Sequence, residues 1–95
     1  MEMENIDLTE KIRAIVGPLT KRPETLLIRR LDKEEMLTQR EQHYLVVCDD
    51  EDLGRVIGRH GINSNAIRTL VNVVARKYKK SAYLTFESFG QNEDW

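Results

Sequence analysis

The sequence lacks the features that stabilise or anchor proteins outside the cytoplasm. It contains one cysteine, so an internal disulfide is impossible and a reducing compartment is the simplest setting. No apolar run approaches the roughly 18 residues that a membrane helix needs. The acidic start, residues 1–5, has no apolar signal core. These absences predict a cytoplasmic protein with no membrane partner.

The motifs of common enzymes are also missing. A Walker loop requires Gly-x-x-x-x-Gly-Lys followed by Ser or Thr, and no Ser/His/Asp or Cys/His set has a plausible catalytic spacing. The acidic block Asp49–Asp52 favours a helix N-terminus, where acids complement the dipole, over a metal site, whose ligands must converge. We therefore expect no enzyme, no small-molecule substrate, no metal and no cofactor.

What is present suits one small soluble domain. The chain has 95 residues, of which 40% are hydrophobic and 33% charged, and this composition is typical of globular rather than disordered proteins. We expect a flexible N-terminus at 1–5, a single domain at 6–89 and a flexible tail at 90–95. A core this small would gain stability from a buried interface with a partner.

The spacing of apolar residues predicts the element order α-β-β-α-α-β. A helical stripe begins near Asp7 and should end at Gly17-Pro18. Short apolar runs at 26–31 and 43–48 suit two strands joined by a charged hairpin. A short helix at about 53–57 and a longer one at 62–78 follow, and then an alternating strand at 82–87. The apolar stripe of the longer helix, which includes Leu70 and Tyr78, should face the core. The expected fold class is α+β, a three-stranded sheet with helices packed on one face.

The net charge of −1 hides a strong asymmetry along the chain. Residues 55–80 contain no Asp or Glu, so this segment carries +7 and the rest of the chain −8. Its bases are Arg55, Arg59, Arg68, Arg76, Lys77, Lys79 and Lys80. An exposed helix normally pairs its bases with acids at i,i+4, and their absence favours a basic binding face.

Within this segment, two glycines bracket two basic residues in Gly58-Arg59-His60-Gly61. Glycine allows the backbone to approach a ligand closely, and a helix N-terminus directs free N–H groups at an anion. The pattern predicts a clamp for a phosphate backbone and hence a nucleic-acid binder. Gly54, four residues earlier in the short helix, costs about 1 kcal/mol relative to Ala, and we interpret it as a close packing contact.

This order of elements, with Leu53-Gly54-Arg55-Val56-Ile57 before the loop and Ala66-Ile67-Arg68 after it, resembles the KH domain of type II, prokaryotic topology. It is most similar to the small bacterial single-KH proteins of the KhpA-like family. The resemblance covers about residues 6–89 and implies RNA binding without catalysis. In KH domains such a loop clamps the backbone of about four single-stranded nucleotides.

The resemblance also implies which residues form the site. Gly58, Arg59, His60 and Gly61 would hold phosphates, and Arg55 and Arg68 would flank the path of the strand. The second strand, at 44–48, would offer backbone groups to base edges. An apolar floor would consist of Val56, Ile57 and Ile67.

The partners that the resemblance implies are single-stranded RNA and either a second copy or a larger Jag-type KH protein. It further implies an RNA chaperone or post-transcriptional regulator linked to cell elongation and division. Two alternatives stay open. The chain could be a protein-interaction adaptor that uses the KH fold for dimerisation, with little RNA binding of its own. It could also bind single-stranded DNA, because a phosphate clamp does not by itself exclude DNA.

Overall fold

The computed structural model describes residues 6–32 and 40–92, and within them the expected α-β-β-α-α-β order is confirmed. The expectations for the N-terminus at 1–5, the tip of the hairpin at 33–39 and the last residues 93–95 lie outside the described residues. The helices and strands are α1 (Thr9–Val16), β1 (Leu27–Arg30), β2 (Glu41–Cys48), α2 (Asp50–Ile57), α3 (Ile62–Lys77) and β3 (Ser81–Ser88). Phe89–Asn92 forms a short 3-10 turn after β3.

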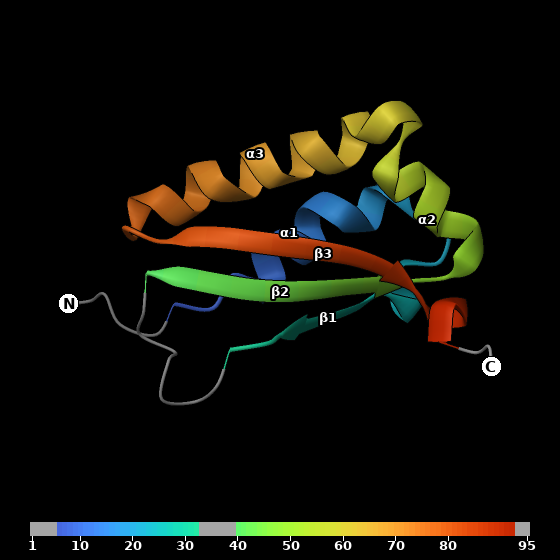
Figure 1. Cartoon of the computed structure of the whole chain (residues 1–95), viewed down its shortest axis with the longest axis horizontal. Coiled ribbons are helices and arrows are strands. Elements are labelled where there is room, and N and C mark those ends of the chain that lie inside the picture. The colour runs from blue at the N-terminus through green and yellow to red at the C-terminus, as the bar shows by residue number, and fades with distance from the viewer. Residues whose placement is uncertain (1–5, 33–39, 93–95) are drawn as a thin grey trace.

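The three strands form one mixed sheet in the order β1-β2-β3. β1 pairs with β2 antiparallel and β3 pairs with β2 parallel, with His43 opposite Tyr83. The three helices lie on one face of this sheet (Figure 1). Strand β2 was expected to offer backbone groups to a ligand, but this prediction is wrong because β2 is the central strand and is paired on both sides. The strand next to α3 with a free edge is β3.

Helix α1 buries the face that its spacing predicts. Leu8, Ile12 and Val16 are fully buried, and the helix ends at Val16, where Gly17-Pro18 continues as a 3-10 turn. Helix α2 begins at Asp50, earlier than the expected residue 53, because acids fit the positive end of its dipole and the whole acidic block can join its first turn.

Helix α3 turns a narrower face to the core than its apolar pattern predicted. The buried positions are Ser64, Ile67, Val71 and Ala75. Leu70 and Tyr78, which were assigned to the core stripe, are 53% and 38% exposed. A helix that packs on a sheet contacts it along one line of residues only. Residues that lie about 100° around the helix from that line remain in solvent. Among the described residues, no helix is long and apolar enough to cross a membrane.

A network of hydrogen bonds attaches the segment just before α1 to strand β2. The Tyr44 hydroxyl accepts a bond from the Leu8 amide at 2.9 Å and donates to Oε1 of Gln42 at 2.9 Å. The Gln42 amide in turn donates to the Ile6 carbonyl at 2.9 Å. Both side chains are fully buried, so each polar atom depends on these partners and not on water.

Replacing Tyr44 with Phe should therefore destabilise the fold by about 1–3 kcal/mol, because a buried amide and a buried carbonyl oxygen lose their partner. Urea unfolding followed by circular dichroism measures the change. Tyr78→Phe is the matched control, since Tyr78 is exposed, and it should leave the free energy of unfolding unchanged. Equal effects of the two substitutions would contradict the role of the Tyr44 network.

Candidate nucleic-acid interface

A close backbone contact builds the turn between α2 and α3. The Gly58 amide donates to the Gly54 carbonyl at 2.8 Å and ends α2. Gly58 has φ 77° and ψ 168°, and a Cβ placed on it would lie 2.9 Å from both Cγ and the amide nitrogen of Asn63. The Asn63 side chain donates to the Arg55 carbonyl at 2.7 Å and so satisfies the end of α2. Only glycine fits at position 58.

The rest of the loop is closed by its own bonds and points its two basic side chains outward. His60 and Gly61 both have positive φ, at 56° and 76°. For a residue with a Cβ, such as His60, this conformation costs about 1–2 kcal/mol. The Gly61 amide donates to the Gly58 carbonyl at 3.0 Å, and the buried Ser64 hydroxyl donates to the Gly61 carbonyl at 3.1 Å. Arg59 and His60 are exposed.

The electrostatic setting of this loop favours anions. Within the described residues, Arg59 and His60 have no carboxylate partner, and the first turn of α3 contains no acid. Helix α3 has 16 residues and begins directly after the loop, so its positive dipole end adds to the two side-chain donors. The loop can therefore receive a phosphate without displacing an internal ion pair.

Arg55 flanks the loop and is held in place by a buried acid. Its guanidinium lies 3.1 Å from Asp52, whose side chain is only 1% exposed, while that of Arg55 is 49% exposed. Asp52 also accepts the backbone amides of Lys21 and Arg22 at 3.0 and 3.4 Å. The Lys21 amide, aided by the Arg22 amide and by Arg55, holds the pKa of Asp52 below its usual 3.8. Its acceptor role was not predicted, since an acid in the first turn of a helix is ordinarily solvated.

Arg68 lies on the other flank, against β3. Its guanidinium donates to the Leu84 carbonyl at 3.2 Å and lies 5.1 Å from the centre of the Phe86 ring. The remaining bases do not gather here. Arg76 and Lys77 belong to the last turn of α3, about 24 Å from the loop at 1.5 Å per residue, and Lys80 is buried. The bases of the +7 segment therefore do not form one continuous face, because Arg55, Arg59 and Arg68 precede or belong to the first half of α3 and the others lie at or beyond its last turn.

The three apolar floor residues occupy different depths. Val56 is fully buried and Ile67 is 2% exposed, and both belong to the core beneath the loop. Ile57 alone is half-buried. Val56 and Ile67 therefore support the loop from below, and a ligand would meet Ile57. Gly54 was interpreted as a packing contact, but this is wrong because a Cβ there would meet nothing within 4 Å.

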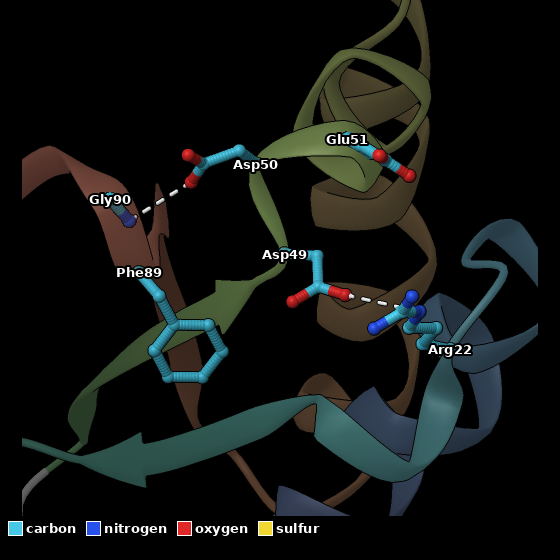
Figure 2. Close-up of a pocket in the computed structure, with 6 residues that line it drawn as sticks. All are labelled: Arg22, Asp49, Asp50, Glu51, Phe89 and Gly90. Atoms are coloured by element: carbon cyan, nitrogen blue, oxygen red, sulfur yellow. Dashed lines mark hydrogen bonds and ion pairs between the residues drawn. The ribbon is translucent and has the colours of Figure 1, made fainter.

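The opposite end of α2 has the reverse charge. An open cavity of about 400 Å³ lies here. Figure 2 shows the residues that line it, Arg22, Asp49, Asp50, Glu51, Phe89 and Gly90. Asp49 pairs with Arg22 at 3.8 Å, and Asp50 accepts the Gly90 amide at 2.9 Å. No group of His, Cys, Asp and Glu in the described part of the chain is arranged to hold a metal ion. The acids repel phosphates, so a nucleic-acid strand would run along the other end of α2.

Comparison with known proteins agrees with this geometry. The KhpA/KhpB KH-domain family matches residues 9–86, from the start of α1 to Phe86 of β3. The chain belongs to this family. It is a family of KH domains and not of enzymes, in agreement with the sequence prediction.

The matched regions of its relatives cover most of the length of the chain. The RNA-binding protein KhpA of Streptococcus pneumoniae is 45% identical over 69 residues, which are 73% of this chain and 81% of that protein. The RNA-binding protein KhpA of Listeria monocytogenes is 39% identical over 77 residues, 81% of this chain and 95% of that protein. That of Lactiplantibacillus plantarum is 36% identical over 88 residues, 93% and 96%. No solved structure matches the chain.

Two glycine substitutions of equal size should have opposite effects. Gly58→Ala should destabilise the protein by more than about 1 kcal/mol, because the new Cβ strains the positive φ and collides with Asn63. Gly54→Ala should stabilise it by about 0.5–1 kcal/mol, because Ala is the better helix former and the site is open. Thermal and urea unfolding measure both. A tolerated Gly58→Ala would contradict the close contact at the turn.

Proposed function

We propose that the chain binds single-stranded RNA by clamping its sugar–phosphate backbone with the loop Gly58–Gly61. The observation that carries the proposal is this loop, closed by its own bonds at the start of α3, with Arg59 and His60 exposed and not paired with any carboxylate of residues 6–32 and 40–92. The relatives at 36–45% identity are named RNA-binding proteins, which supports the same ligand.

The clamp would use three contributions. The positive end of the α3 dipole attracts the anion, the Arg59 guanidinium supplies a planar pair of donors, and the His60 ring adds a further N–H donor. Arg55 and Arg68 border the path on its two sides. Because phosphate contacts release counterions, affinity should fall steeply with salt. Backbone contacts carry no sequence information by themselves, so the clamp is tolerant of sequence.

Such tolerance suits an RNA chaperone or post-transcriptional regulator, the role that the family resemblance implies. A link to cell elongation and division would then depend on which transcripts are bound and on a Jag-type KH partner. Crosslinking in cells, followed by RNA sequencing and mass spectrometry of co-purified proteins, identifies both.

Replacing Arg59 and His60 together with Asp should weaken RNA binding by more than about tenfold, since each charge-assisted bond contributes about 1.5–3 kcal/mol. Fluorescence anisotropy with a labelled oligonucleotide, at several salt concentrations, measures the loss. The matched control replaces Arg76 and Lys77 with Asp at the far end of α3 and should have a much smaller effect.

If the folded loop variant binds RNA as well as the unaltered chain does, the clamp is not at Gly58–Gly61. Competition between RNA and DNA of the same sequence separates the two ligands. Binding of DNA as tight as that of RNA would assign the chain to single-stranded nucleic acid in general.

A second candidate function, assembly with another KH chain, is favoured by the solvent face of α3. Ile62, Leu70 and Val73 are 65%, 53% and 50% exposed, and Ala66 is exposed between them. Their spacing of four, four and three residues aligns them in one apolar stripe. We propose that a second copy of the chain packs on this stripe, with a Jag-type KH partner as the other occupant.

Leu70→Glu should convert such a dimer to a monomer, because a carboxylate would be buried in an apolar contact. Light scattering after gel filtration measures the mass. Leu31 is also 53% exposed, but lies beyond β1, away from α3, so Leu31→Glu is the matched control. A chain that is monomeric before substitution, yet captures a Jag-type partner through Leu70, would favour the heterodimer.

A further inference from the structure

One flank of α3 covers part of the free edge of β3. Asn65, Arg68 and Asn72, spaced three and four residues apart, lie on this flank. Asn72 donates to the Ala82 carbonyl at 3.0 Å and accepts the Ala82 amide at 2.8 Å, so both outward backbone groups of Ala82 are occupied. Two residues further along the edge, the Arg68 guanidinium donates to the Leu84 carbonyl. Side chains therefore close the edge of β3 at this end.

Towards the glycine loop, the next residue of this edge with outward-pointing backbone groups is Phe86. Asn72 meets Ala82 and Arg68 meets Leu84, so α3 and β3 run in opposite directions and the start of α3 lies beside the later part of β3. Backbone groups of alternate strand residues point to opposite sides, so those of Phe86 point outward like those of Ala82 and Leu84. A strand of RNA held at the loop would place a base beside Phe86 and Arg68.

Contacts within the protein hold the guanidinium of Arg68 in one orientation. Its Nη2 donates to the Leu84 carbonyl at 3.2 Å, its Nη1 donates to Oδ1 of Asn65 at 3.4 Å, and its guanidinium lies over the Phe86 ring. Toward the residues that the structure describes, two of its five N–H donors are used in this way. None of the carboxylates in the described part of the chain pairs with it. The planar group is thus fixed in orientation while its charge is not neutralised.

We propose that Arg68 determines base specificity, and that it selects a base whose edge presents two adjacent acceptors. This inference rests on the proposed clamp at Gly58–Gly61. A guanidinium donates two parallel bonds and accepts none. Guanine offers O6 and N7 side by side, and cytosine offers O2 and N3. In adenine an amino group lies beside both N7 and N1, and in uracil an N–H separates the two carbonyl oxygens. The site should therefore favour guanine or cytosine over adenine and uracil.

The test compares four RNA octamers: uridine throughout, or uridine with one central guanosine, cytidine or adenosine. The flanking uridines let the strand slide until the substituted base reaches Arg68. The full chain should bind the guanosine or the cytidine octamer about tenfold tighter than the other two. A fifth octamer with 7-deazaguanosine lacks N7 and should lose the gain if guanine is the base selected, and a gain confined to cytidine identifies cytosine.

Arg68→Lys keeps the charge but cannot form two parallel bonds. It should lose the preference for guanosine or cytidine, measured as the ratio of the affinity for each of these octamers to that for the uridine octamer. Arg76→Lys, in the last turn of the same helix and far from the loop, is the matched control and should keep the preference. Arg68→Met, with its fold checked by circular dichroism, should lose the preference as well as some affinity for all four octamers.

The outcomes separate this inference from the clamp. Equal binding of the four octamers, or a preference that survives in Arg68→Lys, overturns the role of Arg68, while salt-sensitive binding that depends on Arg59 and His60 leaves the clamp in place. If none of the octamers binds at low salt, the clamp and the role of Arg68 are both overturned.

Discussion

The rest of the structure depends on the contact between Gly58 and Asn63. A Cβ at position 58 would meet Asn63 at 2.9 Å, and the Asn63 side chain completes the end of α2 through the Arg55 carbonyl. This contact fixes how α3 departs from α2. The direction of α3 in turn determines which of its faces meets the sheet, which flank covers β3, and where its positive end points.

The position of the loop also explains why a chain of net charge −1 can present a basic site. The acids of α2 are gathered at its first turn, where they line the cavity beside Phe89, and the loop with its bases follows its last turn. Asp52 is the exception. It is buried, accepts the Lys21 and Arg22 amides, and pairs with Arg55. Asp52 thus belongs to the acidic first turn of α2 and forms an ion pair with Arg55 in the basic last turn.

Several elements could be predicted from the sequence because their signals are local. Apolar residues recur with a period of about 3.6 in α1 and α3 and alternate with polar residues in β3, and Gly17-Pro18 ends α1. Each of these signals acts within a few residues. The errors concern neighbours that are distant in sequence. The central position of β2 depends on β3 pairing beside it, and the exposure of Leu70 depends on how α3 lies over the sheet. Gly54 was interpreted as a packing contact although no neighbour approaches it.

The sequence by itself determined the order of the elements, the glycine-bracketed loop with its two basic residues, and the absence of acids around it, because these are properties of neighbouring residues. Only the tertiary structure decided which of the expected site residues reach the surface. Val56 and Ile67 are buried beneath the loop, whereas Arg68 and Asn72 meet the free edge of β3. These outcomes depend on the angle and depth at which α3 packs on the sheet, which arise from contacts across the whole core.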